Sequence, residues 1–439
     1  MKYYLAIDLG ATSGRHVVGY FDNGKITLDE VYRFKTGMDE SNDGLVWDIP
    51  RLNKEIIRGI KESFKIYPNI VSLSIDTWGV DYVLMNNDKE IPPYYAYRNE
   101  RNIEASKKVH ALIPFNELYK LTGIQSANFN TIYQLFDDKE KGRLETATDY
   151  LMLPSYFTYK LTGVKTHEYT NESTGALLNA NTKEYLTEVI NKLGLPNKIF
   201  KSLDYPGLKV GRLLPDIAKE VGGNLDVILC ASHDTASAFE SIEVDEDTII
   251  LSSGTWSLLG IKSNKPIINE QSLRANYTNE GGVNYIRFLK NIMGMYIANR
   301  IIEENNLTQD KVNKEVIKSN YDETFDVNNS SLSSPNNMSE AVRKLLKDNP
   351  PKDVFDLLRS VYQSMAKAYK TAISELEEIV GRKFNKIAII GGGAKNEFLN
   401  KLVNKYTNKQ VIPMPIEATC LGNIKIQMKA RGINYEKRS

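Results

Sequence analysis

The sequence predicts an α/β protein made of two similar halves. Short apolar runs with strand-like alternation are separated by segments with helical spacing, a succession typical of α/β folds. The pattern strand, glycine, threonine or serine, strand over residues 4–13 returns over residues 248–257, which indicates an internal duplication. A soft boundary is expected in the acidic stretch 243–247. This gives an N-terminal domain of residues 1–245 and a C-terminal domain of residues 246–439.

The first half is predicted to open with three strands, a helix and a fourth strand. These elements are expected at residues 3–9, 15–21, 26–34, 52–64 and 71–76, in that order. Asn23-Gly24 stands between the second and third runs, and Asn-Gly between alternating runs is the strongest short-range hairpin signal. An apolar run at residues 227–231 predicts a further strand near the end of this half.

The second half is predicted to begin with a strand pair and to continue into a long helix. Strands are expected at 248–253, 256–262 and 386–390, and helices at 354–380 and from about 396. Gly381 is placed where a glycine would end the long helix in the left-handed conformation. The Asn- and Ser-rich residues 327–337 predict a loop.

Composition limits the classes of partner. The 439 residues include 56 Lys and Arg against 55 Asp and Glu, so the formal net charge is +1. Binding to nucleic acid then has no electrostatic basis. Cys230 and Cys420 form no metal or disulfide motif, and no stretch approaches the roughly 18 apolar residues of a membrane span. We therefore expect a cytoplasmic protein with no nucleic-acid partner and no membrane partner.

Three glycine-containing turns follow predicted strands and could present backbone N–H groups to phosphate. They lie at residues 8–15, 252–255 and 391–393. None is a Walker A loop, and Asn396 stands where a dinucleotide fingerprint needs a third glycine or alanine. Any one of them alone is explained as a hairpin turn, but together they indicate a phosphate clamp shared by two lobes.

Two carboxylates at strand ends could take part in phosphoryl transfer. Asp8 suits Mg²⁺, which binds one or two carboxylates together with water and substrate phosphates. Asp234 lies among small residues, where it could accept the proton of a substrate hydroxyl. The alternative is that Asp234 caps the following helix through the N–H of Ala236 or Ser237, and that His233 is only a hydrogen-bonding residue.

A third strand end carries Asp76-Thr77-Trp78-Gly79-Val80-Asp81. Trp78 and Gly79 suit a polyol, because an aromatic face packs on C–H groups while bare backbone approaches hydroxyls. The alternative places Trp78 in the core of a strand that is kinked at Gly79.

Taken in order, these motifs resemble the FGGY carbohydrate kinases of the actin and hexokinase superfamily. The resemblance runs nearly from end to end of the chain and rests on seven segments. They are residues 8–15, 76–81, 153–163, 232–238, 251–257, 289–294 and 390–393.

The resemblance implies two ribonuclease H-like domains, with ATP and a sugar bound in the cleft between them. It implies that Asp234 is the catalytic base, which takes the proton from a primary hydroxyl of the sugar. Sugar contacts are implied for Gly79, His233, Asp234, Thr235 and Asn291. ATP contacts are implied for Ala11, Thr12, Ser13, Gly14, Arg15, Thr255, Gly391, Gly392 and Gly393, with Mg²⁺ near Asp8 through water.

The substrate expected from this resemblance is a small ketose. Residues 77–81 are most similar to the members that phosphorylate L-rhamnulose to L-rhamnulose 1-phosphate in L-rhamnose catabolism, and L-fuculose is the alternative. An actin-like or chaperone-like ATPase is a further alternative, although it would have no use for Trp78-Gly79 or Asp234. A nicotinamide-dependent oxidoreductase is disfavoured because the dinucleotide fingerprint is missing. Asn99 departs from the family pattern, which has an aspartate there.

Overall fold

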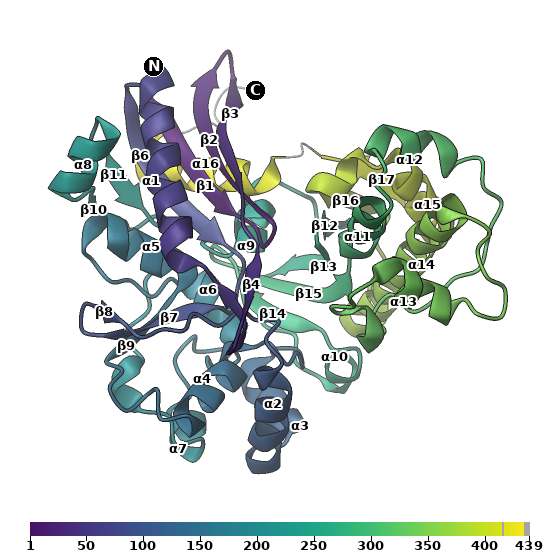
Figure 1. The fold of residues 1–439 in the computed structure, drawn as a ribbon, viewed down its shortest axis with the longest axis horizontal. Coiled ribbons are helices and arrows are strands. Elements are labelled where there is room, and N and C mark those ends of the chain that lie inside the picture. The colour runs from purple at the N-terminus through teal and green to yellow at the C-terminus, as the bar shows by residue number, and fades with distance from the viewer. Residues whose placement is uncertain (415–416, 434–439) are drawn as a thin grey trace.

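The structure is a computed structural model that describes residues 1–414 and 417–433. Two six-stranded mixed sheets, one in each half of the chain, form its framework (Figure 1). The first has the order β10-β11-β6-β1-β2-β3, with β1 (Tyr3–Leu9), β2 (Ser13–Asp22), β3 (Lys25–Lys35), β6 (Ile70–Thr77), β10 (Lys209–Arg212) and β11 (Asp226–Ile228). The second has the order β14-β15-β13-β12-β16-β17, with β12 (Thr248–Ser253), β13 (Trp256–Ser263), β14 (Thr278–Gly281), β15 (Ile286–Met293), β16 (Lys386–Ile390) and β17 (Gln410–Pro413).

The two sheets are built in the same way, which confirms the predicted duplication. In the first, β1 pairs antiparallel with β2 and parallel with β6. In the second, β12 pairs antiparallel with β13 and parallel with β16. Each sheet therefore brings a tight hairpin turn and the carboxyl end of a parallel strand to the same edge.

Several predicted elements appear at the predicted residues. β1, β12, β16 and the long helix α14 (Val354–Val380) begin and end where the sequence indicates. Asn23 and Gly24 have φ of 48° and 81° in the turn between β2 and β3, as an Asn-Gly hairpin requires. Gly381 ends α14 at φ 69°.

Helices cover both faces of each sheet and add a separate layer to the first half. The helices of residues 1–240 are α1 (Ile49–Ile66), α2 (Arg101–Leu112), α3 (Phe115–Thr122), α4 (Thr131–Glu140), α5 (Leu153–Thr162), α6 (Tyr169–Glu172), α7 (Thr187–Lys192), α8 (Pro215–Val221) and α9 (Asp234–Glu240). The later ones are α10 (Glu270–Arg274), α11 (Tyr296–Glu304), α12 (Gln309–Glu315), α13 (Met338–Leu345), α15 (Glu397–Thr407) and α16 (Ala418–Ala430). Short strands complete the first half: β4 (Met38–Ser41), β5 (Gly44–Trp47), β7 (Tyr82–Asn86), β8 (Lys89–Glu90) and β9 (Asp149–Met152).

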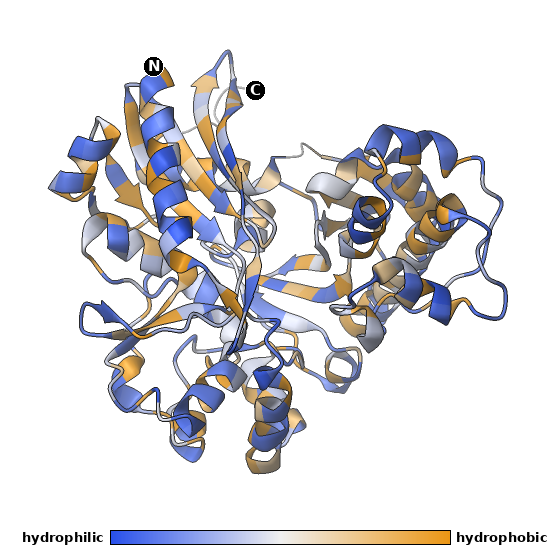
Figure 2. Ribbon diagram, viewed as in Figure 1, coloured by the Kyte–Doolittle hydropathy of each residue, from blue (hydrophilic) through white to orange (hydrophobic). Residues whose placement is uncertain are grey.

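Apolar side chains gather between these layers, as the hydropathy colouring shows (Figure 2). One core joins β1, β2 and β6 to α1, α5 and α8, and another joins α2, α4 and α7 to β7 and β9. A third core joins the second sheet to α11, α13, α14 and α15. Among the described residues, no helix is both long and apolar enough to cross a membrane.

One helix from each half packs on the sheet of the other half. α9 follows the strands of the first half, yet Phe239 and Ile242 near its end pack on Ile250 and Leu289 of the second sheet. α16 follows the strands of the second half, yet Ile424 packs on the first sheet (Figure 1). The two helices also touch each other, because the Cα of Gly422 faces the backbone of Ser237. The halves are therefore joined through two crossed helices at the centre of the molecule.

Candidate active site

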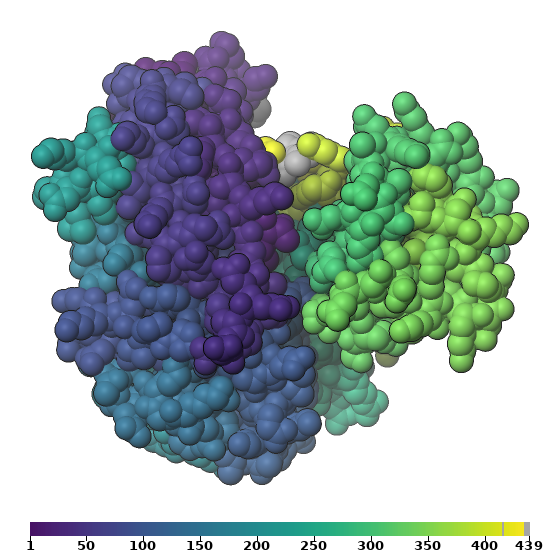
Figure 3. Space-filling model, viewed as in Figure 1, coloured from purple at the N-terminus to yellow at the C-terminus, as the bar shows by residue number. Residues whose placement is uncertain are grey.

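A cavity of about 490 Å³ lies between the two halves, at the edge where the hairpin turns and strand ends meet. The space-filling view shows the surface hollowed between the N-terminal and C-terminal halves (Figure 3). Both halves contribute to its walls, and its volume is in the range of small-molecule sites.

The first hairpin turn enters the cavity with Gly10, Ala11, Thr12 and Ser13. Its shape is fixed locally, because the Gly10 N–H donates to the Ser13 carbonyl over 3.0 Å. Thr36 holds the turn from outside by donating its hydroxyl to the Gly10 carbonyl over 2.6 Å.

Acidic residues stand behind this turn. Asp8 lies opposite Asp76 in the parallel register of β1 and β6. Arg15 donates its Nε to Asp8 over 2.8 Å and also pairs with Glu417. Burial and the neighbouring Asp8 carboxylate raise the pKa of Asp76 well above its ordinary value, although Asn423 of α16 donates to it over 2.6 Å. Within the described residues no group of three or more His, Cys, Asp or Glu could hold a metal ion. Asp8 lines the cavity as a carboxylate paired with Arg15.

The second hairpin turn lines the opposite wall with Gly254 and Thr255. The carbonyls of both residues accept hydrogen bonds from the segment after β15, with Met295 N–H to Gly254 over 2.9 Å and Gly294 N–H to Thr255 over 3.2 Å. These hydrogen bonds hold the turn in place at the cavity wall.

The third glycine turn follows β16. Gly391 has φ 82°, and a Cβ there would lie 2.9 Å from the Ser253 carbonyl, so both its conformation and its packing require glycine. A Cβ on Gly392 would meet nothing within 4 Å, which matches its position in the cavity wall. Gly393 packs on Ser253 and lies outside the wall.

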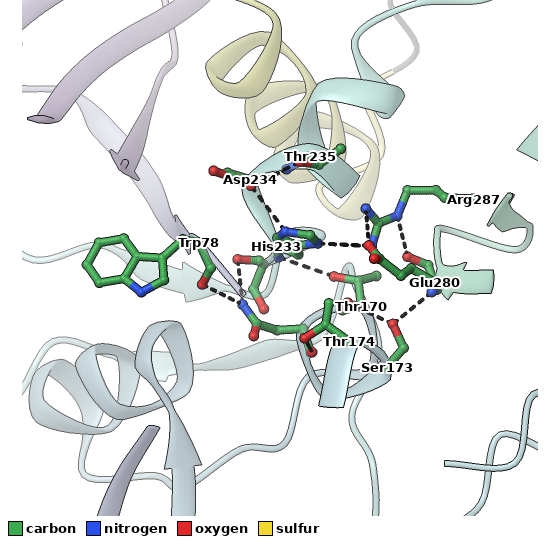
Figure 4. A network of polar contacts seen from close by, with 12 residues as sticks. Trp78, Thr170, Ser173, Thr174, His233, Asp234, Thr235, Glu280 and Arg287 are labelled. Carbon is green, nitrogen blue, oxygen red and sulfur yellow. Dashed lines mark hydrogen bonds and ion pairs between the residues drawn. The ribbon is translucent and has the colours of Figure 1, made fainter. Parts of the chain in front are cut away.

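Asp234 begins α9 and lies in the cavity wall. Its Oδ1 accepts the Thr235 N–H over 2.6 Å and lies 3.3 Å from His233 Nε2 (Figure 4). Among the described residues no group donates a hydrogen bond to Oδ2, and the N–H of Ser237 bonds to the His233 carbonyl instead of to Asp234. The carboxylate therefore does not cap the helix over Ala236 or Ser237. Burial raises the pKa of Asp234, while His233 acts in the opposite direction.

A buried glutamate fixes the loop that carries Asp234. Glu168 is fully buried and accepts hydrogen bonds from the Ser232 N–H over 3.0 Å and from the Thr170 hydroxyl over 2.7 Å. The Thr170 hydroxyl in turn accepts the His233 N–H over 3.4 Å. The backbone N–H groups of Ser232 and His233, directly before Asp234, are thus both held.

Trp78 and Gly79 line the cavity, and Trp78 is also largely buried. Its indole donates to Asp81 Oδ2 over 2.9 Å, and Trp47 donates to the same oxygen over 2.7 Å. Burial raises the pKa of Asp81 to about 6, against the effect of these donors. Trp78 therefore has the core position that the sequence offered as one alternative and also lines the cavity, while its contact with a polyol stays a prediction.

The structure brings together most of the predicted site residues. Those that line the cavity are Asp8, Ala11, Thr12, Ser13, Arg15, Gly79, His233, Asp234, Thr235, Thr255, Asn291, Gly391 and Gly392. Gly14 does not, because it lies in β2, pairs with Leu9 of β1 and packs on Phe34. Gly393 does not either, as described above.

Other wall residues were not predicted. They include Gln125, Phe129, Asn130, Thr174, Trp256, Glu280 and Lys395. Asn130 directly precedes α4, where a polar residue is expected as a helix cap, so it carried no separate signal. Asn99, which departs from the family pattern, is buried and donates its amide to the carbonyls of Asp43 and Leu45. It holds the β4–β5 hairpin and does not line the cavity.

Comparison with known proteins decides the family. Models of the FGGY family of carbohydrate kinases match residues 3–239 with the N-terminal domain and residues 249–431 with the C-terminal domain. The chain belongs to the FGGY family of carbohydrate kinases. The resemblance seen in the sequence motifs is thereby confirmed, and the chain is an ATP-dependent sugar kinase.

FGGY kinases of similar sequence are named rhamnulokinases. One from Oceanobacillus iheyensis is 39% identical over 97% of this chain and 93% of its own length. One from Halalkalibacterium halodurans is 38% identical over 98% and 94%. One from Bacillus subtilis is 35% identical over 97% and 90%.

Solved FGGY-type structures share the fold. A ligand-bound xylulose kinase from Lactobacillus acidophilus has a TM-score of 0.81 at 16% identity, over 99% of this chain and 90% of that one. A Plasmodium falciparum glycerol kinase with ADP has a TM-score of 0.74 at 13% identity, over 98% and 90%. The expected two-domain α/β fold is thus confirmed.

Proposed function

We propose that this kinase transfers the γ-phosphoryl group of ATP to the C1 hydroxyl of L-rhamnulose, giving L-rhamnulose 1-phosphate and ADP. The observation that supports the chemistry is the position of the Asp234 carboxylate. Its Oδ1 is held by Thr235 and His233, and its Oδ2 is available in a cavity that both hairpin turns line. The similarity to rhamnulokinases over nearly the whole chain supports the choice of sugar.

Asp234 is the proposed base. Its Oδ2 accepts the proton of the C1 hydroxyl while the hydroxyl oxygen forms a bond to the γ-phosphorus, and the bond from that phosphorus to the bridging oxygen of ADP breaks. Gly79, His233, Thr235 and Asn291 are the proposed sugar contacts. The raised pKa of Asp234 makes it a better proton acceptor than an exposed aspartate.

The glycine turns are the proposed nucleotide contacts. Ala11, Thr12, Ser13 and Arg15 would hold phosphates from the first half and Thr255 from the second. Gly391 and Gly392 would let the adenosine approach bare backbone, and Gly14 and Gly393 would act by shaping their turns. We propose two domains, residues 1–245 and residues 246–439. α9 of the first domain packs on the second sheet, and α16 of the second domain packs on the first sheet, as described above.

Asp8 is the residue proposed to hold Mg²⁺, through water. Its carboxylate lines the cavity beside the first turn, and Mg²⁺ prefers one or two carboxylates with waters and phosphates over a cage of protein ligands. When bound, the ion would neutralise charge on the phosphates. We further propose that the enzyme works in the cytoplasm and has no nucleic-acid or membrane partner.

The test is ADP release from Mg·ATP with L-rhamnulose, L-fuculose, D-xylulose, L-ribulose and glycerol, and without sugar. The highest kcat/KM is expected with L-rhamnulose. Preference for L-fuculose would keep the base and replace the substrate. ADP release that does not depend on sugar would contradict the proposed chemistry and favour an ATPase.

A further inference from the structure

The side chain of His233 lies between the proposed base and two charged residues of the second sheet. On one side, Nε2 is 3.3 Å from Asp234 Oδ1. On the other, Nδ1 is 3.1 Å from Arg287 Nη2 and 3.5 Å from Glu280 Oε2 (Figure 4). Arg287 comes from β15 and Glu280 from β14, so this contact joins the two halves at the base itself.

The arginine decides which ring nitrogen carries the proton. A guanidinium only donates hydrogen bonds, so a ring nitrogen at 3.1 Å from Arg287 Nη2 must accept. In a neutral imidazole one nitrogen accepts and the other carries the hydrogen. Nδ1 is therefore unprotonated, and the hydrogen is on Nε2, facing the Asp234 carboxylate.

The charge of Arg287 is itself balanced and its position is fixed. The side chain is fully buried, pairs with Glu280 over 3.1 Å and donates its Nε to the Gly281 carbonyl over 2.8 Å. Burial would raise the pKa of Glu280, but the Arg287 guanidinium brings it below the ordinary value, so the carboxylate stays charged. Gly281 is held in turn by the Ser173 hydroxyl, which accepts its N–H over 2.7 Å.

We propose that Arg287 and Glu280 are positioning residues that hold His233 as the Nε2–H tautomer, so that His233 donates to Asp234 Oδ1 and leaves Oδ2 as the proton acceptor. The opposite tautomer would turn a lone pair of Nε2 toward the carboxylate and a hydrogen of Nδ1 toward the guanidinium. Both contacts would then be repulsive. The effect on turnover rests on the proposed function, whereas the tautomer itself does not.

Glu280 makes the role of the arginine testable. Its Oε2 is close enough to Nδ1 that it could accept a hydrogen there once the guanidinium is removed. Arg287→Met is therefore expected to move the proton to Nδ1. Arg287→Lys is expected to keep it on Nε2, because an ammonium group also only donates.

The experiment is ¹H–¹⁵N long-range NMR of the full chain with ¹⁵N-labelled histidine. The chain has four histidines, and His233→Gln identifies the signals of His233 by their loss. Arg101→Met is the matched control, because Arg101 is also a buried arginine, paired with Asp137 and Asp138. Its loss should lower stability and leave the His233 signals unchanged.

The expected result is Nε2–H in the wild type, in Arg287→Lys and in the control, and a protonated Nδ1 in Arg287→Met. With the tautomer lost, kcat should fall by at least about tenfold while the KM for ATP stays within about twofold. Nδ1–H in the wild type would overturn the proposal, as would an unchanged tautomer in Arg287→Met. If Arg287→Met does not fold, the wild-type and Arg287→Lys spectra still decide. A protein that shows the Nε2–H tautomer but phosphorylates no ketose would contradict the proposed function alone.

Discussion

At the scale of single residues, the two oxygens of the Asp234 carboxylate have different roles. Oδ1 takes the contacts from Thr235 and His233, and Oδ2 is available to a substrate. Asp234→Asn keeps the size of the side chain but cannot accept a proton at neutral pH. We expect kcat to fall at least about 10²-fold with ATP binding nearly unchanged. ADP release and calorimetric titration with an ATP analogue measure the two, and unchanged turnover would remove Asp234 from the mechanism.

Asp81 accepts a hydrogen bond from Trp78, which lines the cavity, and so fixes the position of its indole. Its carboxylate accepts from the indoles of Trp47 and Trp78, the N–H of Tyr97 and the amide of Gln134, all of which are donors. In Asp81→Asn the new NH₂ group must face one of them, whichever way the amide is turned. A buried donor without a partner costs about 1–3 kcal/mol, so the free energy of unfolding should fall by that amount and the KM for the ketose should rise.

Urea unfolding and steady-state kinetics test the role of Asp81. Asp88→Asn is the control, because the Asp88 side chain is 83% exposed and the change should leave both quantities as they are. Equal stability of the Asp81→Asn variant and the wild type would show that the four donors find other partners.

His167 should make stability depend on pH. It is buried between Asp149 and Glu172, with Nε2 at 3.2 Å and Nδ1 at 3.3 Å from their oxygens. Burial alone would lower the pKa of His167, but the two carboxylates raise it to about 9. Because the unfolded value is about 6.5, the stabilisation is complete below that pH and is lost as pH rises through about 9.

The full effect of His167 corresponds to about 3 kcal/mol in the free energy of unfolding. Urea unfolding at a series of pH values between 6 and 10 measures it. His167→Asn should remove this part of the pH dependence, and His110→Asn, at a histidine that is only partly buried, should retain it. The same pH dependence in wild type and His167→Asn would contradict the charged pairing.

At the scale of elements, the contact between α9 and α16 couples packing to the base. A Cβ on Gly422 of α16 would lie 1.7 Å from the Ser237 carbonyl oxygen of α9, and α9 begins with Asp234. Gly422→Ala gains about 1 kcal/mol of helix propensity, but an overlap of this size with backbone costs about 1–3 kcal/mol and separates the helices. We expect lower stability together with lower kcat, measured by thermal unfolding and ADP release. The control is Lys429→Ala, at an exposed position of α16, which should change neither the stability nor kcat. A Gly422→Ala enzyme that is more stable than the wild type would mean that the two helices separate without strain.

Elements with buried apolar runs were predictable, and those with buried polar residues were not. β1, β12 and β16 are apolar strands that end at glycine or acidic turns, so the sequence pattern indicates both their existence and their ends. β14, with sequence TNEG, is entirely buried although all its side chains are polar or absent, and Arg287 is fully buried inside β15. Hydrophobic patterning assigns such residues to the surface, because their burial depends on partners from distant segments. Many of the predicted cleft residues lie in turns, and several of the missed ones, such as Thr174 and Glu280, are of this buried polar kind.

At the scale of the whole molecule, α9, α16 and the edge strand β14 join the two halves. Besides α9 and α16, the edge strand β14 is attached to the first half through Ser173 and Gly281, and the neighbouring Tyr277 carbonyl accepts the Tyr119 hydroxyl over 2.8 Å. Asn279 adds a bond to the Gly123 carbonyl over 3.1 Å. We expect a rotation that closes the cleft to preserve these contacts.

Closure is expected because a base beside the γ-phosphate would otherwise activate water. Small-angle X-ray scattering should show a smaller radius of gyration with L-rhamnulose and a non-hydrolysable ATP analogue than with neither ligand. An unchanged radius would contradict closure. As a control, glycerol replaces L-rhamnulose, and it should produce a smaller decrease in the radius of gyration.

The exchange of α16 has a consequence for how the protein is made on the ribosome. The face of the first sheet that carries Tyr4, Ala6 and Val17 is covered by Ile424 and Met428. These strands are synthesised well before the helix that covers them. Their apolar face must therefore stay open until α16 has been made, although nascent domains otherwise fold in order of synthesis. A ribosome stalled within the second half would display an unfinished sheet, the kind of surface that nascent-chain chaperones bind.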